Sequence, residues 1–176
     1  QICLGHPGSK PVLNKKAVEY AIKLCLALGC QISPELIFSR KSYFYPDMSK
    51  NYQITQFEKP LGRHGSLKLK NNKEIHLTRV HIEEDPASLS YPSAMDLSPY
   101  VFIDYNRSGI PLIEIVTEPD FKSPNEARLF LRKLITILEY LSIYTRKSEA
   151  TMKADANIST TGEKVEIKNI TGLKEI

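Results

Sequence analysis

Several carboxylates stand at energetically costly places in this sequence. Glu114 interrupts the apolar run Leu112–Val116, and an unpaired carboxylate buried there would cost several kcal/mol. Its side chain must therefore be paired, hydrogen-bonded or bound to a metal, and an ion pair with Arg107 or Arg79 is the simplest alternative to a functional site. Other acids follow or interrupt apolar strand-like segments in the same way: Glu83, Glu84, Asp85, Asp155 and Glu166.

Some of these acids share a strand face with a base. Because side chains alternate across an extended strand, Asp155 lies on the face of Lys153, and Glu166 lies on the face of Lys168. Carboxylates that converge would hold a hard divalent cation, and nearby bases would neutralise phosphate oxygens. That combination suits phosphoryl transfer, whereas an ordinary solvated sheet face is the alternative for Asp155 and Glu166.

Histidine adds one further ligand candidate. His81 precedes Glu83 by two residues and shares its face of an extended strand. The remaining signatures of catalysis are missing: the sequence has no Walker-type glycine loop, no dinucleotide fingerprint and no histidine at a fixed spacing from a serine or cysteine nucleophile. The acids, with His81 as a weaker candidate, therefore carry the chemical prediction.

Two segments predict the helices that help to position these residues. From Asn14 onward, apolar residues recur at helical spacing, with Asn14 as the N-cap and Gly29 as the stop signal. The second helix begins at Ser123, where an N-cap serine, a proline at the first helical position and a capping-box glutamate occur together. Its apolar periodicity continues to about Leu141.

Most of the remaining chain predicts β-structure. We expect an α+β fold with a mostly antiparallel sheet and two main helices, since about seven short segments are β-branched or aromatic and are separated by turn residues. The segment from Pro86 to Pro99 is predicted to be a long loop. The predicted strands are Tyr52 to Phe57, Ser66 to Lys70, Glu74 to Ile82, Tyr100 to Tyr105, Leu112 to Val116, Thr151 to Ser159 and Lys164 to Ile170.

Composition is that of a soluble globular protein. Of the 176 residues, 41% are hydrophobic and 25% charged, and no run approaches the roughly 18 apolar residues of a membrane span. The beginning of the sequence has neither a signal peptide nor a transit pattern, so we expect a cytoplasmic protein. Cys3, Cys25 and Cys30 cannot all pair with one another, and two of them lie in an apolar helical pattern, so buried free thiols are predicted. Cys3 lacks a CxxC partner, which argues against a zinc site.

Eight ordered motifs resemble the B/E subunit family of tRNA-dependent amidotransferases, along essentially the whole chain. Within that family the sequence looks more like the archaeal E-type subunit of glutamyl-tRNA(Gln) amidotransferase than the B type. The motifs are Cys3 to Pro11, Ser39 to Asp47, Gln53 to Gln56, His81 to Pro86, Asp104 to Gly109, Glu114 to Asp120, Asp155 to Ser159 and Val165 to Asn169.

The resemblance implies a cradle-like catalytic domain that uses ATP and Mg²⁺. The glutamyl γ-carboxylate on misacylated Glu-tRNA(Gln) would be phosphorylated and then amidated with ammonia from an asparaginase-like amidase partner of the D type. For the B type, the partners would be an A-type amidase and a C-type protein, and the substrate could be an aspartyl-tRNA. Either assembly is expected to be a heterodimer or heterotetramer without a membrane component.

The resemblance also implies roles for single residues. Glu83 and Glu114 resemble metal ligands, and His81 is added as a weaker one. Asp155 and Glu166 resemble further acids of the active centre, while Lys41 and Tyr43 resemble residues that line it and bind the nucleotide. Arg107 and Lys168 are chosen for their charge, as candidates that stabilise the phosphoryl group, Arg107 also as a nucleotide-binding residue.

Departures from the family pattern leave two alternatives open. We expect residues 1–176 to be a single catalytic core that lacks the family's N-terminal strand and its C-terminal insertion, helical and tail domains. Such a fragment would be inactive alone. A non-catalytic module that binds tRNA or a partner is the first alternative, since the first third of the chain is basic. A structural fragment with ordinary surface ion pairs is the second.

Overall fold

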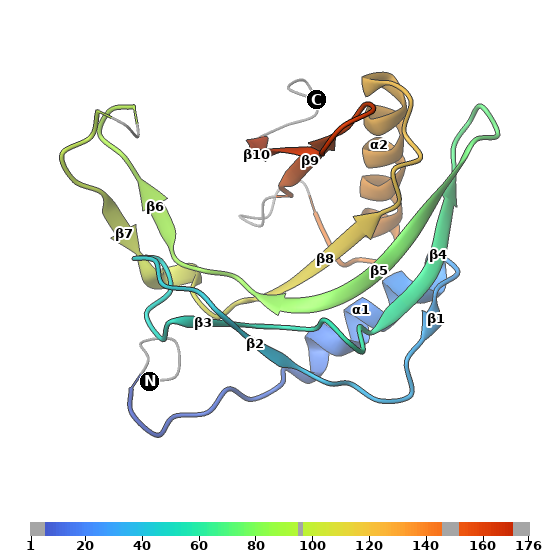
Figure 1. Cartoon of the computed structure of the whole chain (residues 1–176). Coiled ribbons are helices and arrows are strands. Elements are labelled where there is room, and N and C mark those ends of the chain that lie inside the picture. Colours follow the sequence, from blue (N-terminus) through green and yellow to red (C-terminus); the bar gives the residue numbers. More distant parts are fainter. Residues whose placement is uncertain (1–5, 95–96, 146–151, 171–176) are drawn as a thin grey trace. The chain divides into compact units, whose positions relative to one another are not determined.

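A computed structural model describes residues 6–94, 97–145 and 152–170, and the side chains as far as residue 167 (Figure 1). The chain forms two compact units. One comprises Gln1–Gly65 and Leu77–Val116, and the other comprises Ser66–His76 and Thr117–Ile176. The prediction that residues 1–176 form a single catalytic domain stays a prediction.

The two predicted helices are confirmed, with their caps. Helix α1 spans Lys15–Ala27, and the Asn14 side chain accepts a hydrogen bond from the backbone N–H of Ala17. Helix α2 spans Pro124–Tyr140, with Ser123 as N-cap and Glu126 in the first turn. Both helix starts follow from local side-chain chemistry, which is why sequence alone locates them well.

Helix α1 ends in a Schellman motif, which brings two cysteines together. Gly29 has φ +65°, Cys30 N–H donates to Cys25 O at 2.8 Å, and Gly29 N–H donates to Leu26 O at 3.2 Å. Cys25 and Cys30 are buried free thiols, as predicted. A hydrogen bond with Cys30 and burial raise the pKa of Cys25, and Cys3 lies outside the described residues.

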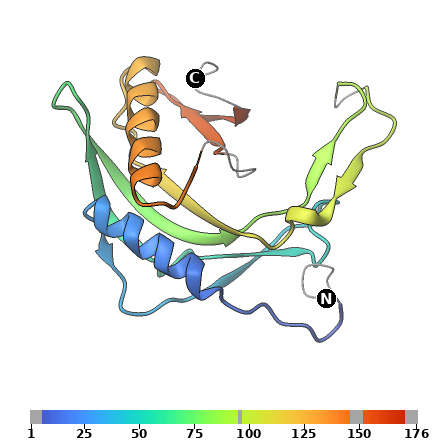
Figure 2. The ribbon, with the colours of Figure 1, turned by 180° about the vertical axis from the view of Figure 1, so that it is seen from behind.

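Two glycines let α1 approach the sheet closely (Figure 2). A Cβ atom on Gly62 would lie 2.5 Å from Cys25 Sγ, and one on Gly65 would lie 2.4 Å from Cys30 Sγ. Real Cβ atoms do not come that close to a sulfur, so both positions require glycine while the thiols stay where they are. At this contact the sheet contributes glycine backbone, and α1 with its C-terminal turn contributes the two cysteine thiols.

The main sheet has four strands in the order β1-β4-β5-β8. Three further pairs, β2/β3, β6/β7 and β9/β10, are antiparallel, as is β1/β4, so the predicted α+β class is confirmed. Ser88–Ser90 forms β6, so the prediction of an uninterrupted loop from Pro86 to Pro99 was wrong. The strand bounds are β1 Gln31–Ile32, β2 Ser39–Ser42, β3 Tyr52–Thr55, β4 Gly62–Lys68, β5 Glu74–Glu84, β6 Ser88–Ser90, β7 Phe102–Asp104, β8 Pro111–Thr117, β9 Ala154–Ile158 and β10 Val165–Ile170.

Strand β5 changes the phase of its buried positions. Ile75 and Leu77 are buried, two residues apart, and the next buried apolar residues are Val80 and Ile82, three and five residues after Leu77. Leu77 lies beside Gly65, in the α1 packing layer. In a regularly alternating strand, His81 would lie on the same face as Leu77. Because the phase changes, Val80 and Ile82 take the core positions instead.

The unit that contains α2 has its own polar and aromatic contacts. Lys73 Nζ lies 2.6 Å from Glu126 Oε2, and Asp120 Oδ2 accepts from both the backbone N–H of His76 at 2.8 Å and its ring Nδ1 at 2.9 Å. Phe130 is buried and meets a neighbouring aromatic ring edge to face. The Lys73–Glu126 pair fixes the start of α2 to the turn between β4 and β5, and Asp120 binds the start of β5.

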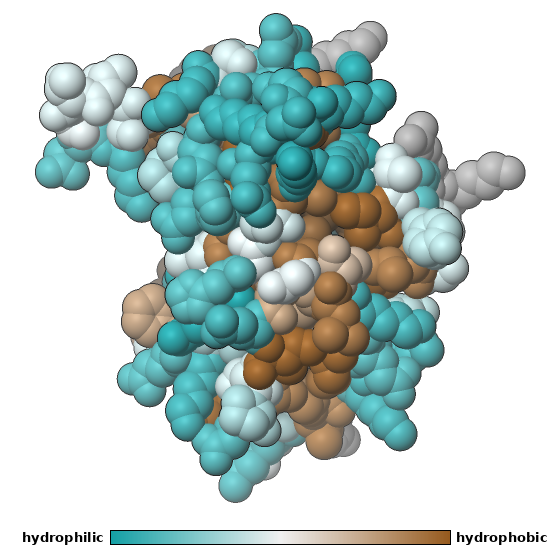
Figure 3. All heavy atoms as spheres, turned by 90° about the vertical axis from the view of Figure 1, so that its right-hand side faces the viewer, coloured by the Kyte–Doolittle hydropathy of each residue, from teal (hydrophilic) through white to brown (hydrophobic). Residues whose placement is uncertain are grey.

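Seen from one side, the surface mixes hydrophilic and hydrophobic side chains (Figure 3). Large apolar side chains that stay exposed include Val12, Leu26, Phe44 and Tyr140. Among the described residues, no helix has the length and apolar character needed to cross a membrane.

Candidate metal and phosphate site

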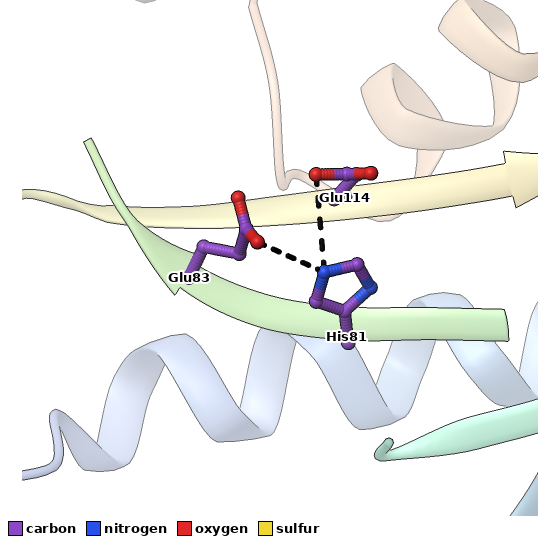
Figure 4. A group of neighbouring side chains, drawn as sticks. All are labelled: His81, Glu83 and Glu114. Carbon is purple, nitrogen blue, oxygen red and sulfur yellow. Dashed lines mark hydrogen bonds and ion pairs between the residues drawn. The ribbon is translucent and has the colours of Figure 1, made fainter. Parts of the chain in front are cut away.

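The functional candidates that the structure brings together come from two neighbouring strands. His81 and Glu83 lie two residues apart on β5, and Glu114 lies on β8. Because β5 and β8 are adjacent in the sheet, the three side chains meet above it. Figure 4 shows them projecting from the sheet on the side away from α1.

Their donor atoms lie close together. His81 Nε2 is 3.1 Å from Glu83 Oε1 and 3.8 Å from Glu114 Oε2 (Figure 4). One donor atom from each of the three residues lies within 4.8 Å of the other two. His81 is 2% exposed, and the Glu83 side chain 10%, whereas that of Glu114 is 45% exposed. The cluster is therefore anchored in the core and open on the Glu114 side.

Strand β3 orients Glu83. Thr55 Oγ1 donates to Glu83 Oε1 at 2.5 Å, and Gln53 Nε2 donates to Glu83 Oε2 at 3.3 Å. With His81, these donors satisfy both carboxylate oxygens, which explains how an acid can be largely buried at the end of an apolar strand. Glu83 is thus held in one position before any ligand arrives.

The pKa values of the two carboxylates are shifted in opposite directions. Burial acts to raise the pKa of Glu83, but hydrogen bonds from His81 and Thr55 outweigh it and bring the pKa below its usual value. Burial and the negative charge of Glu83 raise the pKa of Glu114, against an opposing effect of His81. This is the expected behaviour of two acids that share one site.

The donor set fits a divalent cation. Mg²⁺ is usually bound through one or two carboxylates while it keeps waters and substrate phosphates, and Glu83 and Glu114 supply that pair. His81 fits less directly. Its Nδ1 is buried without a hydrogen-bond partner among the described residues, and ligation through Nε2 would force the proton onto Nδ1. Donation from Nε2 to Glu83 is therefore the better role for His81, that of an orienting neighbour.

A cavity of about 260 Å³ opens beside this cluster. Two cations line it together with the acids, Lys41 from β2 and Arg79 from β5. The other lining residues are Thr55, Gln56, Phe57, His81, Glu83 and Glu114. A wall that contains both acids and cations would suit a metal-bound phosphate group.

Arg107 and Tyr43, two of the predicted site residues, lie outside the cavity lining. Arg107 forms a two-point ion pair with Asp85, with Nε–Oδ2 at 3.0 Å and Nη2–Oδ1 at 2.5 Å. The interpretation of Glu114 as an ion-pair partner of Arg107 was therefore wrong, and within the described residues Arg79 does not pair with it either. Tyr43 follows β2 and is 37% exposed. Catalytic roles for Arg107 and Tyr43 stay predictions.

Glu84 was not assigned a role from sequence, and it has a separate place. It is buried, it forms an ion pair with Lys50 and it accepts a hydrogen bond from the backbone N–H of Ile54 at 2.8 Å. Its neighbour Glu83 faces the cavity instead, so the two consecutive acids serve opposite sides of β5. Glu84 with Lys50 fixes the β2/β3 pair to the end of β5.

Comparison with known proteins identifies the family of this chain. The family model of the GatB/GatE catalytic domain matches residues 1–176. The chain belongs to this family. The B subunit of the aspartyl/glutamyl-tRNA(Asn/Gln) amidotransferase of Saccharolobus solfataricus is 54% identical over 181 residues, which cover 99% of this chain and 38% of that protein. The B subunit from Methanoregula boonei is 52% identical over 180 residues, 99% of this chain and 37% of that protein.

This GatB/GatE-family chain spans well under half the length of those relatives. Another relative, the protein of the same name from Carboxydothermus hydrogenoformans, is 46% identical over 186 residues, 99% of this chain and 39% of that protein. These relatives carry the name of the B type, the sibling that the sequence motifs ranked second to the E type. Family membership is settled, and the choice between the siblings stays a prediction.

The second pair of predicted acids of this GatB/GatE-family chain lies in the other unit. Asp155 on β9 and Glu166 on β10 are exposed, and Glu166 is paired in register with Asn157. Lys168 belongs to β10, but its side chain lies outside the described residues. Catalytic roles for these three residues stay predictions.

Sequence reasoning missed four cavity residues: Thr55, Gln56, Phe57 and Arg79. Thr55 and Gln56 belong to a motif that the resemblance quoted, although no role was drawn from it. Arg79 had a usable signal, because it precedes His81 by two residues, as His81 precedes Glu83.

Proposed function

We propose that this chain is the part of a tRNA-dependent amidotransferase that activates the side-chain carboxylate of a misacylated tRNA with ATP. The carboxylate oxygen of the glutamyl group would attack the γ-phosphorus, forming an acyl phosphate and releasing ADP. Ammonia would then attack the acyl carbon and release phosphate, leaving the amide. The observation that carries the proposal is the pair Glu83 and Glu114 beside a cavity that also contains Arg79 and Lys41.

The protein's own residues have defined tasks in this scheme. Glu83 and Glu114 would hold Mg²⁺, which supplies charge neutralisation on the phosphate oxygens. His81 and Thr55 hold Glu83 in place through their hydrogen bonds. Lys41, which is exposed, would add positive charge to the cavity wall. Because phosphoryl transfer depends mainly on positioning and electrostatics, such a constellation needs no protein nucleophile.

The substrate and the partners are part of the proposal. We favour Glu-tRNA(Gln) with ammonia from an asparaginase-like amidase of the D type, as the E-type motifs indicate. A second candidate is the B type, which would act on aspartyl- or glutamyl-tRNA with an A-type amidase and a C-type protein. It is favoured by the names of the relatives, which are B subunits of aspartyl/glutamyl-tRNA(Asn/Gln) amidotransferases. Amidation assays with both misacylated tRNAs separate the two.

The test is Glu114→Gln in the intact protein. Glutamine keeps the size of the side chain and removes the charge that holds the cation, so ATP-dependent formation of the acyl phosphate should fall by about 100-fold or more. Glu35→Gln is the matched control, because Glu35 pairs with Lys59 on the surface of the same unit. ATP turnover that is unchanged in Glu114→Gln would show that the assignment is wrong.

The alternative, a non-catalytic module that binds tRNA, predicts a different binding result. For the enzyme, binding of Mg²⁺-ATP should be saturable, should depend on Mg²⁺ and should weaken in Glu114→Gln. For the module, only salt-sensitive tRNA binding should be observed. The cavity with its acids and cations supports the enzyme.

A further inference from the structure

Arg79 is a cation in the wall of the cavity. It lines the same cavity as His81, Glu83 and Glu114. Among the residues that the structure describes, no carboxylate forms an ion pair with it, in contrast to Arg107, which is bound to Asp85. Its Nε atom is buried and has no hydrogen-bond partner in the described part of the chain. A buried guanidinium nitrogen with nothing to bind is costly.

Within the described part of the chain, the surroundings hold the Arg79 side chain without hydrogen bonds to it. The guanidinium carbon lies 6.0 Å from the centre of the Phe57 ring, at the outer limit of a cation–π contact. Arg79 also acts on Glu114 from a distance, because its charge opposes the rise in the pKa of that carboxyl. Packing and long-range charge thus position the guanidinium beside the cavity, and within the described residues no ion pair occupies it.

The cavity is small for a ligand pocket. At about 260 Å³ it falls below the range of about 300–1,000 Å³ that suits a whole drug-sized ligand. A planar guanidinium can bind two oxygens of a phosphate or carboxylate at once, which the single ammonium of Lys41 cannot do. Lys41 is also exposed, so its charge is weakened by water.

We infer that Arg79 is the anion-binding residue of this cavity and that it holds the oxygens of a phosphate group beside Glu83 and Glu114. The inference deepens the proposed function and rests on it for the identity of the phosphate, which would be the group that is transferred. Arg79 then belongs to the residues that touch the substrate. This role differs from that of a neutralising neighbour, which would act only on the charge of Glu114.

The test measures binding of two separate probes to the intact protein. Affinity for Mn²⁺ alone is followed by electron paramagnetic resonance, and affinity for pyrophosphate in the presence of Mn²⁺ by calorimetry. Arg79→Gln should weaken pyrophosphate binding by 10-fold or more, as about 1.4 kcal/mol of lost interaction requires, and should leave Mn²⁺ binding unchanged or tighter. Arg63→Gln is the control, since Arg63 is exposed on β4 and outside the cavity lining.

A neutralising role predicts a different result for pyrophosphate. Mn²⁺ affinity would rise in Arg79→Gln while pyrophosphate affinity stayed at the wild-type value, and that result overturns the inference. Arg79→Lys covers the case in which the glutamine variant does not fold. Lysine keeps the charge and loses the two-point geometry, so pyrophosphate binding should still weaken severalfold, and a wild-type affinity in this variant also overturns the inference.

The outcomes separate this inference from the proposed function. If wild-type protein binds pyrophosphate in an Arg79-dependent way but does not convert ATP, the proposed function is wrong and the anion site stands. If ATP activates the tRNA-bound carboxylate while Arg79→Gln binds pyrophosphate normally, the proposed function stands and the anion site is wrong. Wild-type protein that binds no pyrophosphate contradicts the inference directly.

Discussion

Thr55→Val tests whether the hydroxyl of Thr55 holds Glu83 in place. Valine keeps the branched shape and removes the donor that reaches Glu83 Oε1 at 2.5 Å. Thr55 is 8% exposed, so water cannot readily replace the lost hydroxyl. A hydrogen bond to a charged group contributes about 1.5–3 kcal/mol, and we expect the free energy of unfolding to fall by that amount. Gln53 and His81 still donate to the carboxylate, which keeps the loss from being larger.

The assay is denaturant unfolding of the intact protein at neutral pH with a metal chelator present. Thr55→Ser is the matched control, because serine keeps the hydroxyl and loses only one methyl group, for which we expect a loss below about 1.5 kcal/mol. If the serine variant loses as much stability as the valine variant, the methyl group and not the hydrogen bond stabilises this position. A valine variant as stable as wild type would equally refute the reasoning.

Two further predictions concern the packing and the pH response. Gly62→Ala should lower the free energy of unfolding by about 1–3 kcal/mol, because the new Cβ would lie 2.5 Å from Cys25 Sγ. Gly162→Ala is the control and should change the free energy of unfolding little, since a Cβ there would have no atom within 4 Å. In a double-mutant cycle, adding Cys25→Ala to Gly62→Ala should recover part of the lost stability. An additive cycle would show that the sulfur contact is not the cause. Hydrogen bonds from the backbone and ring of His76 keep the pKa of Asp120 below its usual value, so its contribution to stability is present above the unfolded pKa of about 3.9 and is lost as pH falls through the folded pKa. Asp120→Asn should therefore be less stable than wild type at neutral pH and equally stable near pH 2, as measured by unfolding at both pH values. The same loss of stability at both pH values would contradict this.

The sequence predicted those parts of the fold that depend on local chemistry. Asn14 and Ser123 cap their helices as expected, because an N-cap needs only the residue and its next turn. Short strands such as Gln31–Ile32 and Ser88–Ser90 were not predicted, since two or three residues have no periodicity to detect. Their pairing partners lie far away in sequence, where local patterns carry no information.

The site was predicted as a list of residues and not as a geometry. An acid inside an apolar run, such as Glu114, indicated a residue that needs a partner, and the structure places it beside His81 and Glu83. It could not identify the partner, because the meeting of β8 with β5 depends on sheet order. Thr55 and Arg79 were missed for a related reason: their polar groups have ordinary local surroundings, and only the tertiary structure places them at the cavity.

The phase change in β5 makes the length of this strand as important as its residues. Between Leu77 and Val80 the buried side of the strand switches, so Val80 and Ile82 enter the core while Arg79, His81 and Glu83 line the cavity. Deleting one residue in that interval would restore a regular alternation and turn either the apolar pair or the polar set to the wrong side. Relatives that keep the site are therefore expected to vary here by substitution and never by insertion or deletion.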